Sequence, residues 1–581
     1  LVEDEFNIYQ PIVDKGATVS VKLTNNTNAN DYQFKEIPVT IPGQFIVEEG
    51  DNEAPNVLPE VREWKGGSGV YEISEATRIV YKEELFKDAA EALAKDYKEL
   101  TGKELTVVQA EEAQDGDIFF KQTEGKGLFK EGYLMNIGTQ VVVEAEEYTG
   151  AYWATRTILQ SIKADGYIPQ GITRDYPLYE VRGFILDVGR KTFTMDYLKQ
   201  VVQEMAWYKM NDFQVHLNDN YIFLERYTAE GEDPLTAYSG FRLESDIKKG
   251  GNGGLNQADL TNTDVFYTKD EFREFIKESR KCGVNIIPEI DVPAHSLAFT
   301  KVRPDLRHGT DGRNNDHFAL NTKFDECVEF IQSVFDEYMG TDVENPVFDE
   351  DTIVHIGCDE YSAGAAAFRN FSNTMIDYVQ DRDRTVRMWG SLTSLKADVV
   401  VKSEDVQMNL WNFGWANMDQ MYEEGFDLIN CNDGGYYIVP NAGYYGDYLN
   451  NNTMYNQLIN SIGGVTIPAG DKQMLGGAFA VWNDMVDKQD NGISEWDVYD
   501  RIKQPIALLG ANLWGKQNLS LNNAIALSKE LGSAPGNNFG YEVEDTDGVI
   551  AHYPMDDMTA ANLSSAKNAA IQEVDGKNAL K

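Results

Sequence analysis

The sequence predicts an α/β protein in which a (β/α)8 TIM barrel follows a small α+β domain, with β-rich extensions at both ends. Its 581 residues, 42% of them hydrophobic, are too many for one small core, so the length predicts several domains. From residue 180 to about 515, a short apolar run ending in polar residues is followed by an amphipathic helix, and this unit repeats eight times. A (β/α)8 barrel requires this repeat.

The first 178 residues contain two segments of different pattern. In residues 1–65, polar and apolar positions alternate among Asn, Pro and Gly, as in VSVKL and IPVTI, which predicts a β-rich extension. In residues 66–178, strand-like runs such as ELTVVQA and QVVVEAE alternate irregularly with two helical stretches, EELFKDAAEALAKDYKEL and GAYWATRTILQSIK. This second segment is predicted to be a small α+β domain.

Residues 179–530 are predicted to form the barrel. Its eight strands are expected at GFILDV, FQVHLND, VNIIPEID, TIVHIGCDE, VRMWG, VQMNLWN, FDLINCN and LGGAFAVWND. The helix EFREFIKESRKCG is preceded by a capping box of Thr268 and Glu271. The longest interruption, roughly 220–267, contains KKGGNGGLN and is predicted to be a mobile insertion after the second strand.

Residues 531–581 are predicted to be a linker followed by an incomplete β-rich segment. The composition shifts after LGSAPGNNFG, and GVIAHYPMDD resembles the opening of a jelly-roll, lectin-like module. Too few residues follow to complete such a module, so we expect the chain to be cut there.

The charge balance restricts the partners. With 95 acidic and 51 basic residues the net charge is −44, which repels nucleic acid and anionic membrane surfaces. The commonest role of such charge is solubility. No apolar run reaches the ~20 residues that cross a bilayer, so we expect no membrane insertion. Four scattered cysteines predict neither a disulfide framework nor a zinc site.

Polar and aromatic side chains gather where the predicted barrel strands end. In a barrel these positions build the active site. Indole rings beside carboxylates suit a sugar, whose C–H faces pack on aromatic surfaces while its hydroxyls need acceptors. The residues are Asp187, His216, Asp219, Glu289, Asp291, His295, Asp359, Glu360, Trp389, Trp411, Asp433, Trp482 and Asp484.

The stretch HIGCDEY at 355–361 carries two adjacent acids, Asp359 and Glu360. In a continuous strand they would face opposite sides, so both can meet one substrate only if the strand ends there. Their repulsion raises one pKa, which favours a protonated carboxylic acid near neutrality. At this point they could be an ordinary acid and nucleophile. The alternative is an exposed acidic pair in a loop. It is disfavoured because the seven other predicted strand ends also carry polar or aromatic side chains.

Metal and cofactor chemistry are not expected. His216, His295 and His355 lie on or after barrel strands, but none has an HxxxH or HxH partner. A serine or cysteine nucleophile is also unsupported, because no GxSxG is present and Cys358 has no base beyond nearby His355.

Five motifs in order resemble glycoside hydrolase family 20, the β-N-acetylhexosaminidases. They are RGFILDVGR (182–190), KMNDFQVHLNDN (209–220), PEIDVPAH (288–295), HIGCDEY and VWND (481–484). The α+β domain ahead of the barrel fits the family's usual N-terminal domain. The resemblance implies retaining hydrolysis by substrate-assisted catalysis, in which the sugar's own 2-acetamido oxygen attacks C1 and forms an oxazolinium intermediate.

The resemblance also implies roles for single residues. Glu360 would be the general acid and then the base, and Asp359 would orient the acetamido N–H and stabilise its growing charge. Tyr436, in preference to Tyr437, would donate to the acetamido oxygen. The remaining implied roles are a relay behind Glu360 (Asp219, His295), an acetamido pocket (Trp389, Trp411, Trp482) and contacts to ring hydroxyls (Arg182). For Trp389 core packing is an alternative, and for Arg182 a structural ion pair.

Three residues bear on what the enzyme releases. Many exo-acting members of the family carry Glu where this chain has Asp484, and the shorter acid, with Gln214 and Tyr444, could leave room for a second sugar. We therefore favour a lacto-N-biosidase, which releases Galβ1-3GlcNAc from milk or mucin glycans, over an exo-β-N-acetylglucosaminidase. The expected partner is an oligosaccharide or glycoconjugate, at an extracellular or bacterial cell-surface location. An inactive glycan-binding barrel stays open as a different class, because fold alone does not confer catalysis.

Overall fold

The computed structural model describes residues 11–540, except 13, 26, 44–49, 246–260, 262–264, 310–315, 342, 469, 486–492 and 517, together with strands β23 (Ile571–Val574) and β24 (Lys577–Leu580). The stretches KKGGNGGLN and GVIAHYPMDD, for which a mobile insertion and a lectin-like module were predicted, lie outside the described residues. In the part of the chain that is described, no helix is both long and apolar enough to cross a membrane.

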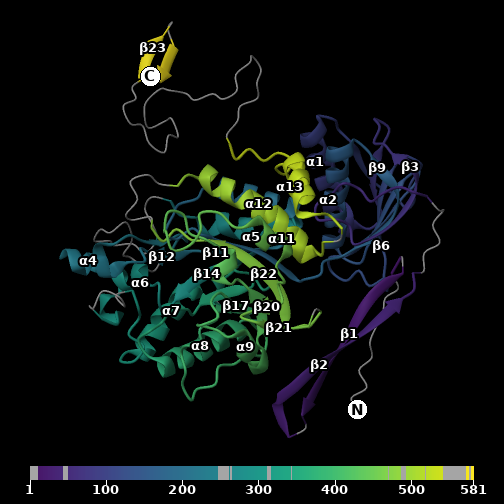
Figure 1. The fold of residues 1–581 in the computed structure, drawn as a ribbon. Coiled ribbons are helices and arrows are strands. Elements are labelled where there is room, and N and C mark those ends of the chain that lie inside the picture. The colour runs from purple at the N-terminus through teal and green to yellow at the C-terminus, as the bar shows by residue number, and fades with distance from the viewer. Residues whose placement is uncertain are drawn as a thin grey trace.

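The N-terminal segment contains an antiparallel hairpin of β1 (Lys15–Asn25) and β2 (Asn28–Ile41). Figure 1 shows it as a purple arm that extends away from the body of the molecule. Side chains in the middle of the arm, including Val21 and Leu23, are exposed.

The α+β domain is a seven-stranded mixed sheet of order β3-β9-β7-β8-β6-β4-β5. Its first strand, β3, begins slightly before the boundary predicted at 65/66 and pairs with β9, so the sheet takes in residues assigned to the extension. The strands are β3 (Glu63–Tyr71), β4 (Arg78–Tyr81), β5 (Thr106–Gln109), β6 (Ile118–Gln122), β7 (Tyr133–Ile137), β8 (Val141–Ala145) and β9 (Ile168–Asp175); the helices are η1 (Glu84–Phe86), α1 (Lys87–Thr101) and α2 (Tyr148–Asp165).

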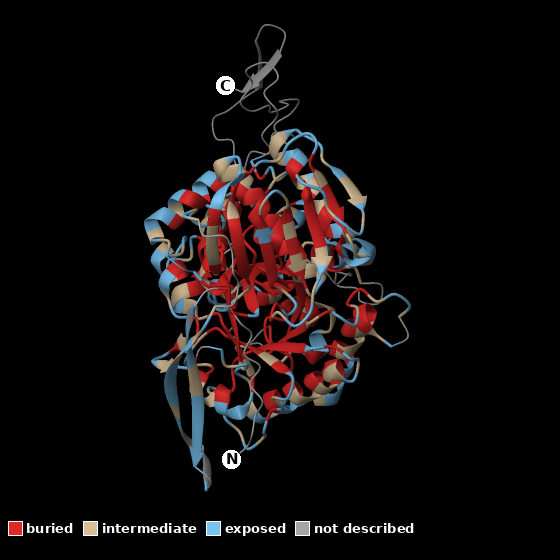
Figure 2. Cartoon of the chain, turned by 90° about the vertical axis from the view of Figure 1, so that its right-hand side faces the viewer, coloured by how far each residue is buried: buried red, intermediate tan, exposed pale blue. Residues whose placement is uncertain are grey.

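Helix α2 joins this domain to the barrel. It contacts β7, β8 and β9 of the sheet and also α3 and α13 on the barrel side. Every residue from Gly150 to Ser161 is buried, which is the behaviour of a helix covered on all sides. Residues of α2 and of the barrel strands belong to one core cluster. Figure 2 shows buried residues throughout the interior of the molecule.

Eight parallel strands close the barrel, and each lies at one of the eight predicted runs. Their order is β10-β11-β14-β15-β16-β17-β18-β22, and pairing of β10 with β22 closes the ring, so the predicted barrel is confirmed. The strands are β10 (Val181–Asp187), β11 (Asp212–His216), β14 (Asn285–Val292), β15 (Val354–Gly357), β16 (Val386–Trp389), β17 (Val406–Leu410), β18 (Asp427–Asn430) and β22 (Met474–Val481).

Helices surround the barrel strands, and short strands and 3-10 helices occur within the connecting loops. Thr268 caps α5, since its side chain accepts a hydrogen bond from the Glu271 amide. The helices are α3 (Met195–Trp207), α4 (Leu224–Glu230), α5 (Lys269–Lys281), α6 (Leu297–Val302), α7 (Phe324–Met339), α8 (Ala365–Gln380), α9 (Met418–Glu424), α10 (Asp433–Tyr436), α11 (Asn451–Asn456), α12 (Glu495–Trp514) and α13 (Leu521–Leu531). The short elements are β12 (Asn218–Asn220), η2 (Pro234–Thr236), β13 (Ser239–Phe241), η3 (Pro304–Leu306), β19 (Tyr437–Ile438), β20 (Ser461–Ile462) and β21 (Val465–Thr466).

The two faces of each barrel strand enter different cores. On β10, Phe184 and Leu186 pack outward against the helices, in the main core. Val181 and Ile185 belong to a second cluster inside the barrel, together with Trp389, Trp411 and Trp482. This alternation decides which residues of each strand can reach the site.

Candidate active site

A cavity of about 310 Å³ opens at the C-terminal ends of the barrel strands. Of the twelve residues predicted for the site, eight line it: Asp219, His295, Asp359, Glu360, Trp411, Tyr444, Trp482 and Asp484. The other four, Arg182, Gln214, Trp389 and Tyr436, are buried elsewhere. His216 and Asp291, which were among the predicted strand-end residues but were given no role, also line it, as do Arg190, Phe223, Tyr437 and Tyr445.

The backbone after β15 explains how two adjacent acids reach one cavity. The strand ends at Gly357, and Gly357, Cys358 and Glu360 have φ values of 69°, 74° and 39°. These left-handed conformations break the two-residue alternation of the strand, so Asp359 and Glu360 both face the cavity. Such conformations are costly for residues other than glycine and concentrate at functional sites.

Glu360 is connected to a buried relay. Its Oε2 lies 3.2 Å from Nε2 of His295, whose Nδ1 lies 3.1 Å from Oδ1 of Asp219. Burial opposes a charge on His295, but Asp219 and Asp359 outweigh it and hold the pKa of the imidazole well above its usual value. A cationic His295 can stabilise the carboxylate that forms when Glu360 gives up its proton.

Asp359 is poised to accept a hydrogen bond from a ligand. Its Oδ1 is buried, and in the described part of the chain it has no hydrogen-bond partner. Burial, only partly offset by His295, together with the charge of Glu360 raises the pKa of Asp359 to about 6. Burial and the charge of Asp359 raise the pKa of the neighbouring Asp291 carboxyl well above its usual range.

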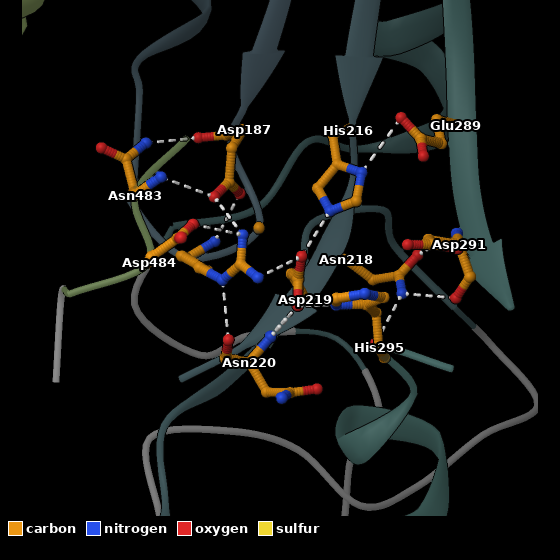
Figure 3. A network of polar contacts seen from close by, with 12 residues as sticks. Asp187, His216, Asn218, Asp219, Asn220, Glu289, Asp291, His295, Asn483 and Asp484 are labelled. Atoms are coloured by element: carbon orange, nitrogen blue, oxygen red, sulfur yellow. Dashed lines mark hydrogen bonds and ion pairs between the residues drawn. The ribbon is translucent and has the colours of Figure 1, made fainter. Parts of the chain in front are cut away.

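Arg190, the last residue of RGFILDVGR, is the arginine of the site. Its guanidinium lies 2.8 Å from Asp219, 3.1 Å from Asp187 and 3.3 Å from Asp484. It therefore joins Asp219 of the relay to Asp484, and Figure 3 shows these two carboxylates. Its place just beyond the end of β10 was the signal that could have identified it.

Arg182, predicted to bind ring hydroxyls, does not reach the cavity. It is fully buried, and its Nη1 lies 3.2 Å from Oε1 of Glu131, in the α+β domain. Its Nε donates to the Lys209 carbonyl oxygen at 2.7 Å. Arg182 shares the outward face of β10 with Phe184, and it lies at the end of the strand opposite the site, so the structural ion pair is the correct interpretation.

Gln214 and Trp389 lie below the cavity, inside the barrel. Gln214 donates to Oε2 of Glu289 at 2.8 Å and accepts from Asn409 at 2.7 Å. Trp389 donates from its indole nitrogen to Oε1 of Glu289 at 2.6 Å. Both therefore support the floor of the site through Glu289, and neither lines the cavity.

Tyr437, not Tyr436, faces the cavity. Tyr436 is fully buried in the outer core, and its hydroxyl has no hydrogen-bond partner in the described residues. Tyr437 belongs to the inner cluster, with its ring centroid 5.6 Å from that of Trp482. Burial raises the pKa of Tyr437 well above its usual value, so its hydroxyl stays a donor. Which of two adjacent tyrosines faces the cavity depends on which face of the short strand β19 points inward, and the sequence does not show this.

Asp484 and aromatic side chains build another part of the cavity wall. The Tyr444 hydroxyl donates to Oδ2 of Asp484 at 2.7 Å, and the Tyr444 and Phe223 ring centroids are 5.9 Å apart. The loop that carries Trp482 and Asp484 is fixed through Asn483, whose backbone N–H and side-chain amide both donate to Asp187.

Two carboxylate and histidine clusters at the site have ligand atoms close enough to share a metal ion. They are His216, Glu289, Asp291 and Asp219, Asp291, His295, with the atoms of each set within 4.8 Å of one another. Apart from Asp291, these side chains already form ion pairs within the network, and a metal ion would have to replace those pairs.

Comparison with known proteins gives two adjoining family matches. Residues 54–176 match glycosyl hydrolase family 20, domain 2, and residues 179–369 match the glycosyl hydrolase family 20 catalytic domain. Together they cover more than half of the chain.

Relatives and solved structures agree with these matches. The lacto-N-biosidase of Bifidobacterium bifidum is 22% identical over 77% of this chain and 39% of its own length. A β-hexosaminidase of Akkermansia muciniphila is 31% identical over 33% of this chain and 36% of its own length. The β-N-acetylhexosaminidase of Streptomyces coelicolor shares the fold with a TM-score of 0.63 at 18% identity, over 83% of this chain and 97% of that one. The chain thus spans about two fifths of the length of these two curated relatives.

Proposed function

The chain belongs to glycosyl hydrolase family 20, and on this premise we propose that it is a retaining glycosidase that cleaves the bond after an N-acetylhexosamine. One observation carries the proposal. Oδ1 of Asp359 is a buried acceptor without a hydrogen-bond partner among the described residues, and it lies beside the relay-linked acid Glu360. A sugar whose acetamido group supplies its own nucleophile needs these two groups and no enzyme nucleophile.

In the proposed mechanism, the acetamido oxygen attacks C1 while the bond from C1 to the leaving oxygen breaks. Glu360 gives its proton to that oxygen, and the product of the step is an oxazolinium ion. Asp359 accepts the acetamido N–H and balances the positive charge, while Tyr437 takes the donor role towards the acetamido oxygen. The Glu360 carboxylate then removes a proton from the water that attacks C1, while the bond from C1 to the acetamido oxygen breaks; this regenerates the acetamido group and restores the configuration.

We further propose that the released sugar is the disaccharide Galβ1-3GlcNAc. Asp484 is one methylene shorter than Glu, and Tyr444 and Arg190 hold it back against the wall. Phe223 and the half-exposed Tyr444 offer an aromatic rim to a second ring. The likeness to a lacto-N-biosidase over most of this chain supports the proposal. Release of N-acetylglucosamine alone is the second candidate, favoured by the likeness to β-hexosaminidases.

The test uses p-nitrophenyl β-lacto-N-bioside and p-nitrophenyl β-N-acetylglucosaminide. We expect nitrophenol from the disaccharide conjugate. Release only from the monosaccharide conjugate contradicts the biosidase, and release from neither contradicts the enzyme. Glu360→Gln should lose about 10²–10⁴-fold on an unactivated glycan and much less on a nitrophenyl leaving group, because only the former needs the acid. Equal losses on both would rule out that role.

Milk and mucin glycans lie outside cells, so we propose an extracellular or bacterial cell-surface location. Antibody labelling of intact cells of the source organism should detect the protein. Signal only after lysis would contradict this location.

A further inference from the structure

We propose that His216 and Glu289 extend the relay behind Glu360 into the barrel and act as positioning residues for the acid. The inference rests on the proposed function. It adds a second histidine and a second carboxylate to a chain that reads Glu360, His295, Asp219, His216, Glu289. Neither added residue touches the glycosidic oxygen; each acts through Asp219 and His295.

The contacts of the extension are as close as those of the first half. Oδ2 of Asp219 lies 2.8 Å from Nε2 of His216, and Nδ1 of His216 lies 3.0 Å from Oε2 of Glu289 as an ion pair. Figure 3 shows His216 pointing from β11 between the two carboxylates. The two oxygens of Asp219 are thus divided, one to His295 and the other to His216 and Arg190.

The far end of the chain is held by neutral donors. Glu289 receives hydrogen bonds from Gln214 at one oxygen and from Trp389 at the other. With His216 it is almost completely inaccessible to solvent, at 0% and 1% exposure. Barrel interiors are ordinarily filled by branched apolar side chains, and an ion pair there gives little stability against an apolar replacement. The pair therefore calls for a role other than packing.

That role is to fix the charge and orientation of Asp219. Burial opposes a charge on His216, but Glu289 and Asp219 outweigh it and hold the pKa of its imidazole well above the usual value. Burial likewise opposes the Asp219 carboxylate, and Arg190 and His295 outweigh it, so its pKa lies well below the usual range. The result is an alternating row of charges that keeps His295 cationic and aimed at Glu360.

Other charged groups also face His216, and they set how large the effect can be. Glu289 and Asp219 contact it directly, and the other charged groups act through space. The uncharged Trp482 ring lies against the imidazole, with the ring centroids 5.0 Å apart. Burial, despite Glu289, lowers the pKa of His355 to about 3, so this neighbour is neutral at the pH of an assay. The remaining neighbours are Arg190, Asp291 and Asp359.

Two variants test the charges separately. Glu289→Gln removes a negative charge, while Asp219 still contacts His216 and favours its charge, so the alkaline limb of the pH profile of kcat should move to lower pH. His216→Gln keeps a donor towards Asp219 but removes the positive charge, so the limb should move to higher pH. We expect shifts of about one pH unit and losses of about 10–100-fold on an unactivated glycan, smaller on the p-nitrophenyl conjugate.

The matched control is Asp212→Asn on the same strand as His216. Asp212 forms a buried ion pair with Arg387 at 2.7 and 2.8 Å, towards the other end of β11. It undergoes the same change from carboxylate to amide and should lower stability without moving the limb. The proposal would be overturned if the alkaline limb of the kcat profile stayed in place in both relay variants. It would also be overturned if the limb moved in the same direction by equal amounts in both.

A measurement on the unaltered protein covers the case in which a variant fails to fold or the enzyme assay fails. In ¹⁵N-labelled protein, the imidazole nitrogens of His216 should show an imidazolium between pH 6 and 8. A neutral His216 at pH 7 would overturn the inference. Failure of the proposed function can be told apart from failure of this inference. In that case the unaltered protein would hydrolyse neither conjugate, whatever the charge state of His216.

Discussion

At the scale of single residues, the site depends on which of two neighbouring tyrosines faces inward. Tyr437 lines the cavity and Tyr436 packs in the outer core. Tyr437→Phe should therefore reduce kcat by about 10²–10³-fold, the usual cost of a lost donor at a developing charge. Tyr436→Phe is the matched control and should change kcat less than twofold, because its hydroxyl has no partner among the described residues. Kinetics on the p-nitrophenyl conjugate decide between them, and a larger loss in Tyr436→Phe would restore the original assignment.

Asp359 should set the acid limb of the activity profile. Its pKa is raised to about 6, mainly by burial. Below that pH the carboxyl is protonated and can no longer balance an oxazolinium charge, so kcat should fall as the pH drops through about 6. In Asp359→Asn the activity should be lost and no such limb should remain in the residual rate.

The same shift makes a prediction for stability. A carboxyl whose folded pKa lies above its unfolded value destabilises the fold once it must ionise, so the penalty is absent near pH 4 and complete above about pH 6. Asp359→Asn should thus raise the free energy of unfolding by about 1–3 kcal/mol at pH 8 and hardly at all near pH 4. Urea unfolding at the two pH values measures this, and an equal gain at both would contradict it.

At the scale of elements, the end of β15 is where the strand pattern stops being informative. HIGCDEY has the alternation of a strand, yet Gly357, Cys358 and Glu360 adopt left-handed backbone conformations. A Cβ on Gly357 would lie 2.0 Å from Oδ1 of Asp291. The glycine thus permits both the turn and the close approach of the neighbouring strand.

Gly357→Ala should therefore cost both stability and activity. We expect more than about 2 kcal/mol of destabilisation and at least a tenfold loss of kcat, because the alanine must displace Asp291 and re-aim Glu360. Gly102→Ala at the end of α1 is the control, since it has a similar φ of 72° but nothing within 4 Å of the added methyl. It should lose about 1 kcal/mol and no activity. Equal effects in unfolding and kinetics would show that backbone strain alone is responsible.

The periodicity of apolar runs was enough to locate the eight barrel strands, because each run is buried on both faces and reads as continuous apolar sequence. For the same reason it could not say which face points inward. On β10, for example, the apolar run does not show that Phe184 faces the outer core and Ile185 the inner one.

At the scale of the whole molecule, the α+β domain and the barrel share buried ion pairs. Arg182 of β10 pairs with Glu131, and Lys209 pairs with Asp175 at 2.9 Å. Removing one partner leaves the other charge buried and unpaired, which is more damaging than the pair is stabilising.

Arg182→Met should lower the free energy of unfolding by about 3–5 kcal/mol while KM and kcat stay within twofold. Arg78→Met is the control, because Arg78 also pairs with an acid, Asp117 at 2.6 Å, but its side chain is 32% exposed. Its partner Asp117 keeps a hydrogen bond from the Gln114 amide, so the loss of stability should be smaller than in Arg182→Met. Thermal unfolding and kinetics on the p-nitrophenyl conjugate distinguish the cases, and a raised KM with intact stability would return Arg182 to the substrate.

The sequence by itself determined the barrel, the domain ahead of it, the family and the acid pair of Asp359 and Glu360, because these follow from local periodicity and from motifs whose residues are close in the chain. Only the tertiary structure decided that Tyr437 belongs to the site, that Gln214 and Trp389 support it from below, and that His216 and Glu289 continue the relay. Those assignments depend on strand parity and on charges brought together from different strands. Spacing along one chain does not encode either of them.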